Sequence, residues 1–218
     1  MSNQYEVVIV GGGFSGLLCG YFLKEAGIED FCILEMGASL GGVWQKGGVG
    51  GYPGAACDVP SYAYLPFLDR IGFIPSKKYV TQHEIANYTD KLVEYCGLEP
   101  HIRFSTKVTS INYVGTGQWQ ISTHGMAKGS DSGNYVATHV VSASGPLSTP
   151  RMPEVAGMQQ FKGASFHTAQ WDYGVDLKGK HVGIIGTGAS AAQVITSIAD
   201  EVETLTVFQR SATWALPR

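Results

Sequence analysis

Two glycine-rich hexapeptides, far apart in the chain, have the residue types and the spacing of a phosphate-binding turn. The first is Gly11-Gly-Gly-Phe-Ser-Gly16, and the second is Gly186-Thr-Gly-Ala-Ser-Ala191. In such a turn the first glycine permits the tight bend, the second lets the backbone approach a pyrophosphate, and the third position lets the helix pack close to the strand. Ala191 in the third position still allows that packing. We therefore expect both segments to bind dinucleotides through the N–H groups of a helix N-terminus.

The residues around both turns predict a strand before each turn and a helix after it. Tyr5 to Val10 and His181 to Ile185 are short apolar runs, typical of buried parallel strands. Apolar residues recur at helical spacing after each turn, and a second apolar run follows at Phe31 to Leu34 and at Leu205 to Phe208. The sequence therefore predicts an α/β fold with two Rossmann-like dinucleotide-binding units.

A charged residue ends the second strand of each unit, and the two charges have opposite signs. Glu35 follows Gly11 at the same offset in the sequence as Arg210 follows Gly186. The Glu35 carboxylate can accept hydrogen bonds from ribose hydroxyls but would repel a 2′-phosphate, so the first unit is predicted to bind FAD or NAD. The Arg210 guanidinium offers a charge-assisted fork to a 2′-phosphate, so the second unit is predicted to prefer NADP. The alternative for Arg210 is an ordinary solvated arginine.

The region between the two units predicts a small antiparallel β meander and a connector. Short β-type runs between residues 107 and 141 are separated by Gly/Ser-rich turns. Three prolines between residues 146 and 153 then indicate an extended segment. We place the domain boundary there. An FAD-binding domain is expected at residues 1–149, and residues 150–218 are expected to hold a linker and the first half of an NADP-binding domain.

Three further segments supply candidate residues. The glycines of Gly41-Gly-Val-Trp44 suit a close approach of the backbone to the rest of the dinucleotide, although Trp44 is equally compatible with core packing. Tyr52 to Asp58 has turn chemistry and ends in a carboxylate that suits a place near the flavin or nicotinamide, although an aspartate there is commonly a cap or turn residue. Thr81 and Glu84 match a capping box at the start of a helix.

Composition and charge argue against several other classes of function. The formal net charge of −3, without blocks of like charge, gives no reason to expect binding to nucleic acid or to an anionic membrane. Residues 1–6 lack a basic region, and no apolar stretch is long enough to span a bilayer, so the sequence predicts a cytoplasmic protein. The four cysteines form no C-x-x-C pair, which argues against a metal site or a redox-active dithiol.

One segment resembles the fingerprint of a known family. Phe161-Lys-Gly-Ala-Ser-Phe-His167-Thr-Ala-Gln-Trp171-Asp172 matches F-x-G-x-x-x-H-x-x-x-W-[PD] at every defined position, just before the second glycine turn. This pattern is that of the Baeyer–Villiger monooxygenases, which are class B flavoprotein monooxygenases. The resemblance extends over essentially all 218 residues. The sequence departs from the family at Ala56, where an arginine is common, and family members run far beyond Arg218.

The resemblance implies an FAD- and NADPH-dependent enzyme that converts ketones to esters or lactones with O₂, through a flavin C4a-peroxide. In the family the region after Arg218 supplies the arginine that stabilises the peroxide, so we expect that this chain alone does not perform oxygenation. Two alternatives stay open. One is a flavin-containing monooxygenase that oxygenates nitrogen or sulfur. The other is a truncated, non-catalytic dinucleotide-binding protein, whose unpaired sheet edge would favour self-association or pairing with a complementing chain.

The resemblance also implies roles for single residues. Asp58 corresponds to a group that tunes the flavin region, and His167 belongs to a linker that couples domain motion to turnover. With the first glycine turn, the implied FAD contacts are Gly11, Gly13, Ser15, Gly16, Glu35, Gly42, Trp44, Asp58, Tyr64, Val108 and Gly145. With the second turn, the implied NADP contacts are Gly186, Thr187, Gly188, Ala189, Ser190 and Arg210.

Overall fold

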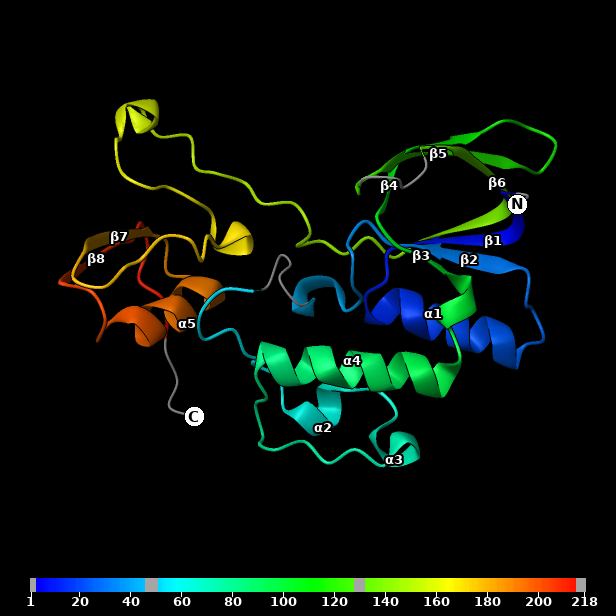
Figure 1. The fold of residues 1–218 in the computed structure, drawn as a ribbon, viewed down its shortest axis with the longest axis horizontal. Coiled ribbons are helices and arrows are strands. Elements are labelled where there is room, and N and C mark those ends of the chain that lie inside the picture. Colours follow the sequence, from blue (N-terminus) through cyan, green and yellow to red (C-terminus); the bar gives the residue numbers. More distant parts are fainter. Residues whose placement is uncertain (1–2, 46–50, 128–131, 215–218) are drawn as a thin grey trace.

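The computed structural model describes residues 3–45, 51–127 and 132–214, and it has two lobes joined by an extended connector (Figure 1). The larger lobe holds a six-stranded sheet, and the smaller lobe holds a two-stranded sheet with one α-helix. No helix within the described ranges is both long and apolar enough to span a membrane.

The six-stranded sheet combines a parallel part with an antiparallel part. Its strands are β1 (Gln4–Val10), β2 (Phe31–Leu34), β3 (Ile102–Arg103), β4 (Thr106–Tyr113), β5 (Trp119–Gly125) and β6 (Asn134–Ser142). The strand order is β3-β2-β1-β6-β5-β4, with β1 parallel to both β2 and β6. Strands β4, β5 and β6 form the predicted antiparallel meander. It continues the parallel sheet, because β6 pairs with β1 as well as with β5.

Helices cover one face of this sheet, and a second βαβ unit forms the smaller lobe. The helices of the larger lobe are α1 (Phe14–Glu25), α2 (Ser61–Tyr64), α3 (Leu68–Ile71) and α4 (Gln82–Cys96), with 3₁₀ turns η1 (Gly42–Trp44) and η2 (Glu99–His101). The connector contains the 3₁₀ turns η3 (Met158–Gln160) and η4 (Thr168–Gln170). The smaller lobe consists of β7 (His181–Ile185), α5 (Ala189–Ile198) and β8 (Thr204–Phe208), and its two strands are parallel. Both predicted units are therefore present.

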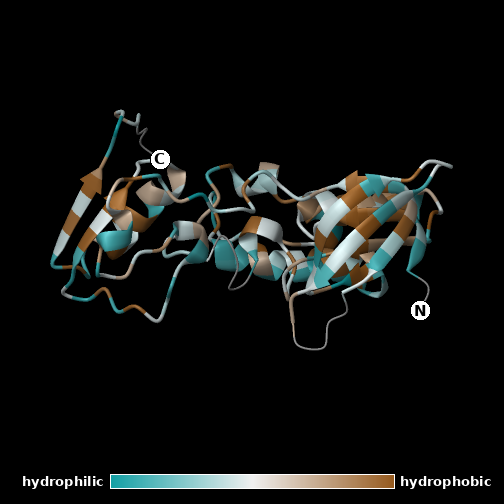
Figure 2. Cartoon of the chain, turned by 90° about the horizontal axis from the view of Figure 1, so that it is seen from above, coloured by the Kyte–Doolittle hydropathy of each residue, from teal (hydrophilic) through white to brown (hydrophobic). Residues whose placement is uncertain are grey.

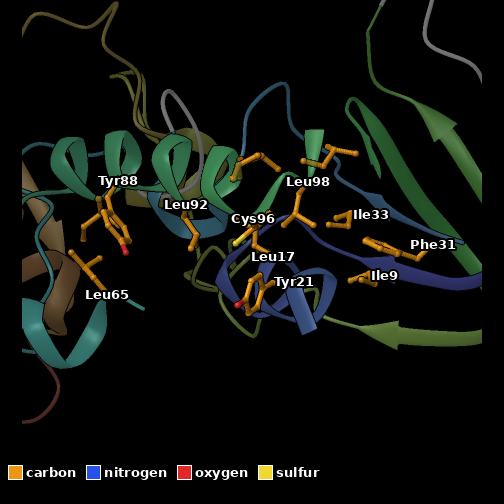
Figure 3. Close-up of a cluster of buried hydrophobic side chains, with 14 of the residues drawn as sticks. Ile9, Leu17, Tyr21, Phe31, Ile33, Leu65, Tyr88, Leu92, Cys96 and Leu98 are labelled. Atoms are coloured by element: carbon orange, nitrogen blue, oxygen red, sulfur yellow. The ribbon is translucent and has the colours of Figure 1, made fainter. Parts of the chain in front are cut away.

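The alternation of side chains along β1 and β2 explains why both strands are apolar throughout. Ile9 and Ile33 face α1 and α4, where they join the main hydrophobic cluster with Leu17 and Leu92 (Figure 3). The intervening residues point to the opposite face, where Val8 belongs to a second cluster that includes residues of β5 and β6. Strands that are buried on both faces carry no polar alternation. Along the meander strands, by contrast, apolar and polar residues alternate (Figure 2).

Helix α4 begins and ends where the sequence predicts, but the prediction of a capping box is wrong. Thr81 is the N-cap, and Gly97 ends the helix with a φ of 59°. The Thr81 side chain makes no capping hydrogen bond. The Glu84 carboxylate instead accepts hydrogen bonds from the backbone N–H of Ser76, at 2.8 Å, and from the Ser76 hydroxyl. The loop before the helix brings these two donors within reach, and they replace the N-cap amide as partners of Glu84.

We predict that Leu92→Ala destabilises the larger lobe, because Leu92 is fully buried in the main cluster. Truncation of a buried leucine leaves a cavity and lowers the free energy of unfolding by about 2–5 kcal/mol. The measurement is urea unfolding of both proteins. Leu147→Ala is the matched control, because Leu147 is 68% exposed and its truncation should change stability by less than about 0.5 kcal/mol. Equal, small losses in the two variants would contradict the described core.

Candidate functional site

The two glycine turns have the same backbone conformation. Gly11 and Gly186 have φ angles of 110° and 112°, in the region that favours glycine. Gly13 and Gly188 are the N-caps of α1 and α5, with φ/ψ of −79°/179° and −72°/−179°. In each turn the amide of the first glycine donates to the carbonyl of the last residue of the neighbouring strand, at 2.9 Å. The repeated unit that the sequence predicts is thus repeated in its local geometry.

Both helix N-termini have backbone donors available for an anion. Within the described parts of the chain, no side chain caps α1 or α5 at its first residue, and neither first turn contains an acidic residue. A Cβ added to Gly186 or Gly188 would meet nothing within 4 Å, so the space beside the second turn is open. Free N–H groups and the positive end of the helix dipole attract phosphate oxygens. Both turns therefore fit a pyrophosphate.

The third position of the turn sets how closely the helix approaches the strand. A Cβ on Gly16 would overlap the carbonyl oxygen of Gly11. Glycine at this position therefore permits α1 to start directly against the end of β1. In the second turn Ala191 takes this position, and its methyl group is buried.

Glu35 is held rigidly beside the first turn. Its side chain is buried, with 7% of the residue exposed. One carboxylate oxygen accepts a hydrogen bond from the Gly12 N–H at 2.7 Å, and the other accepts one from the Gly37 N–H at 2.6 Å. Each carboxylate oxygen can accept a further hydrogen bond. The carboxylate is therefore placed, oriented and still able to accept hydrogen bonds from ribose hydroxyls.

Two other backbone segments lie against the first turn. The amide of Gly41 donates to the Gly12 carbonyl at 3.0 Å, which brings Gly42 next to Gly13. The amide of Ala143 donates to the Val10 carbonyl at 2.9 Å, so the peptide that leads to Gly145 leaves β6 beside the turn. The structure thus places Gly42, and the peptide that leads to Gly145, beside the same turn, although they come from separate parts of the sequence.

Trp44 and Tyr64 form a pair on the same side of the lobe. The indole N–H of Trp44 donates to the Tyr64 hydroxyl at 2.6 Å, and the Tyr64 ring lies 5.8 Å from that of Phe14 at the start of α1. Burial raises the pKa of Tyr64, and the negative charge of nearby Asp58 raises it further, while the bond from Trp44 lowers it. Tyr64 is therefore a neutral phenol at physiological pH. Asp58 itself is exposed, next to this pair.

The remaining two residues of the predicted FAD group lie on α1 and on β4. Ser15 is exposed in the first turn of α1. Val108 lies on β4, two residues after Thr106 in the sequence. The Thr106 amide donates to the Glu35 carbonyl at 2.8 Å. Strand β4 is therefore tied directly to the end of β2.

A cavity of about 370 Å³ lies at the second turn. Its lining consists of Ile185, Gly186, Thr187, Phe208, Arg210 and Ser211. The structure therefore brings Arg210 to the glycine turn, as the sequence predicts. Ala189 and Ser190 form the first turn of α5, beside this cavity.

His167 lies in the connector, at the start of η4. It is the N-cap of η4, and its Nδ1 accepts a hydrogen bond from the Ala169 N–H at 3.0 Å. It lines a cavity of about 480 Å³ with Arg151, Met152, Pro153, Glu154 and Ile185. Because Ile185 lines both cavities, His167 belongs to the surroundings of the second turn. Among the described residues, the hydrogen bond of His167 is to Ala169, whereas Asp58 lies near Tyr64.

The rest of the fingerprint segment has a local structural role. A Cβ on Gly163 would come within 2.7 Å of the Phe161 ring. The Asp172 carboxylate accepts a hydrogen bond from the Gly174 N–H at 2.9 Å and so stabilises a turn. The next residue, Tyr173, donates its hydroxyl hydrogen bond to the Gly51 carbonyl in the larger lobe at 2.6 Å. A contact between the lobes thus directly follows the fingerprint.

Sequence reasoning missed one residue, Gln193 on α5. Its side chain contacts Tyr52 and Ala56, which belong to the other lobe and lie far away in the sequence. The only available signal is its place among apolar residues of a helix, and that signal does not identify its partners.

We predict that Glu35→Gln destabilises the chain in the absence of any nucleotide. Glutamine has one acceptor oxygen, so its amide N–H₂ would face one of the two backbone N–H groups. A buried donor without an acceptor costs about 1–3 kcal/mol. Urea unfolding measures the loss, and Glu94→Gln, at an exposed position of α4, is the control. Unchanged stability in Glu35→Gln would show that the two backbone bonds are not formed.

Comparison with known proteins reveals similarity over nearly the whole chain. The family model described as flavin-binding monooxygenase-like matches residues 4–218. A Baeyer-Villiger monooxygenase of Streptomyces coelicolor is 40% identical over 221 aligned residues, which cover 99% of this chain and 40% of the relative. Cyclohexanone monooxygenase from Rhodococcus sp. Phi1, solved bound to NADP+, superposes with a TM-score of 0.87 at 35% identity, covering 100% of this chain and 40% of that one. OTEMO, solved in complex with FAD and NADP, superposes with a TM-score of 0.86 at 32% identity, covering 96% of this chain and 39% of that one. The chain thus spans about 40% of the length of these proteins.

Proposed function

Because this chain belongs to the flavin-binding monooxygenase-like family, we propose that it provides the FAD- and NADPH-binding turns of a monooxygenase that converts ketones to esters or lactones. The observation that carries the proposal is the pair of matching glycine turns with opposite charges beside them. Glu35 adjoins the first turn, and Arg210 adjoins the second. The acid would exclude a 2′-phosphate from the first site, and the base would pair with a 2′-phosphate in the second site. Each site would therefore bind a different cofactor.

The first site would hold FAD through backbone and carboxylate contacts. The N–H groups at the start of α1 would bind the pyrophosphate, and Glu35 would accept hydrogen bonds from the ribose. Gly42, Trp44 and Tyr64 gather on the same side of the turn, which supports their assignment to this cofactor. Ser15, Val108 and Gly145 are assigned to the same site as its outer contacts.

The second site would hold NADP at the start of α5. Gly186 to Ser190 would bind the pyrophosphate through backbone N–H groups, and Arg210 would pair with the 2′-phosphate. The cavity that Arg210 shares with Thr187 supports this assignment. We further propose residues 1–149 as the FAD-binding domain, and residues 150–218 as the linker with the first part of the NADP-binding domain.

The bound flavin, once reduced by NADPH, would supply the activation of O₂ for insertion of one oxygen atom beside a ketone carbonyl. The residues of this chain would position the two cofactors and shape the charge around them. Asp58 would place a carboxylate near the flavin, next to the neutral Tyr64 hydroxyl. His167 would act at the connector, because it lines a cavity beside β7.

The cofactor part of the proposal is tested by adding FAD to the chain, removing free flavin, and recording the flavin absorbance during anaerobic addition of NADPH. Retained flavin that bleaches supports both sites. A chain that retains no FAD would overturn the proposal, and a chain that retains FAD that never bleaches is not a complete reductase.

The ketone class is tested separately on the monooxygenase that contains these two turns, by product analysis with a cyclic ketone and with a thioether, in the presence of FAD, NADPH and O₂. A lactone would support the proposed reaction. Sulfoxide as the sole product would support oxygenation of sulfur instead.

We predict that Arg210→Ala lowers the preference for NADPH over NADH by about ten- to a hundredfold, because a hydrogen bond to a charged group contributes about 1.5–3 kcal/mol. The measurement is the ratio of the two dissociation constants. Arg70→Ala is the control, since Arg70 is an exposed arginine on α3 of the larger lobe, where it donates to the Tyr21 hydroxyl. An unchanged ratio in Arg210→Ala would identify Arg210 as an ordinary surface residue.

A further inference from the structure

The side-chain amide of Gln193 on α5 joins the second unit to the segment before Asp58. Its Nε2 donates to the Ala56 carbonyl at 2.8 Å, and its Oε1 accepts from the Tyr52 hydroxyl at 3.0 Å and from the Ala56 N–H at 3.4 Å. Figure 1 shows the cyan segment before α2 reaching α5. One side chain of the smaller lobe thus pairs with both backbone groups of a single residue in the larger lobe.

The segment from Ala55 to Cys57 is held on both of its edges. On one edge the Ala55 carbonyl accepts from the Gln82 N–H at 2.8 Å, and the Cys57 N–H donates to the Val80 carbonyl at 3.0 Å. In extended backbone the N–H and C=O groups of the intervening residue, Ala56, point to the opposite edge of the segment. Gln193 lies on that second edge and pairs with Ala56 as a neighbouring strand would. Asp58 follows Cys57 directly, so the hydrogen bonds on both edges of the segment fix the position of its peptide.

The backbone also approaches α5 closely at this place. A Cβ on Gly54 would lie 2.7 Å from the Gln193 carbonyl oxygen and would overlap the Ser197 hydroxyl. Gly54 also has a φ of 77°, which favours glycine. The turn before Ala55 therefore fits against α5 only without a side chain at this position.

Helix α5 links this contact to the second glycine turn. The helix begins after Gly188, and Gln193 is about 6 Å further along its axis, given a rise of about 1.5 Å per residue. A short helix moves as a rigid unit. A displacement of the turn on dinucleotide binding would therefore be transmitted along α5 to the Ala56 peptide.

We propose that Gln193 is a positioning residue that couples dinucleotide binding at the second turn to the place of the Asp58 peptide at the first site. This proposal rests on the proposed function, because that function assigns the two cofactors to the two turns. Gln193 acts through Ala56 and needs no contact with either cofactor.

The contact itself is tested by hydrogen exchange of single backbone amides, measured by NMR without any nucleotide. In Gln193→Ala we expect the Ala56 amide to exchange at least about tenfold faster, because it loses its acceptor. The Cys57 amide, which is bonded to Val80, should keep its rate. Thr196→Ala is the matched control, because the Thr196 hydroxyl bonds only to carbonyls of its own helix among the described contacts. An unchanged Ala56 rate in Gln193→Ala would overturn the proposal.

The coupling is tested by titrating the FAD-loaded chain with NADP⁺ and recording the flavin absorption spectrum. We expect NADP⁺ to shift the spectrum of the wild-type chain and of Thr196→Ala. In Gln193→Ala we expect at least about a fivefold smaller shift, with the dissociation constant of NADP⁺ changed by less than about threefold. Gly54→Ala should reproduce the smaller shift by pushing the segment away from α5 while Gln193 is intact.

The outcomes separate this inference from the function on which it rests. A full spectral shift in Gln193→Ala and Gly54→Ala, with both cofactors bound, would overturn the coupling alone. A wild-type chain that retains no FAD or binds no NADP⁺ would overturn the proposed function and the coupling with it. The exchange rate of Ala56 would still show whether Gln193 holds the segment.

Discussion

The close approach of a helix N-terminus to the end of a parallel strand is the constraint on which this structure depends. At the first turn, a single added carbon on Gly16 would overlap the backbone of Gly11. That approach points the free N–H groups of α1 past the carboxyl end of β1, where the neighbouring strand places Glu35. The helix can pack there because β1 and β2 are apolar on both faces. The ligand-binding geometry and the core are therefore consequences of the same contact.

Because that contact is repeated, the chain has two turns with the same backbone conformation but with different side chains beside them. The first glycines of the two turns have nearly the same φ, yet one turn adjoins a buried carboxylate and the other an exposed guanidinium. Backbone geometry thus provides what the two sites share, which is a set of N–H donors of the kind that bind a pyrophosphate. One side chain at the end of each second strand provides the difference. The lobes meet where α5 approaches the segment before Asp58, so the sites are not independent.

Local features of this fold could be predicted from the sequence, and long-range contacts could not. The strands, helices and turns of both units follow from apolar spacing and glycine positions, and Glu35 and Arg210 lie where the strand ends require. The capping box failed because Ser76, in a loop of no regular pattern, offers Glu84 better donors. Gln193 was missed because its partners depend on how two lobes pack.

The two backbone N–H groups that donate to the Glu35 carboxylate also affect the entropic cost of nucleotide binding at the first turn. Its rotamer is already selected during folding by the amides of Gly12 and Gly37. A ribose bound there as proposed would meet an acceptor that is already immobilised, so that part of the entropic cost of association would not arise. If the first turn binds a nucleotide as proposed, no rotamer search at Glu35 would slow its capture.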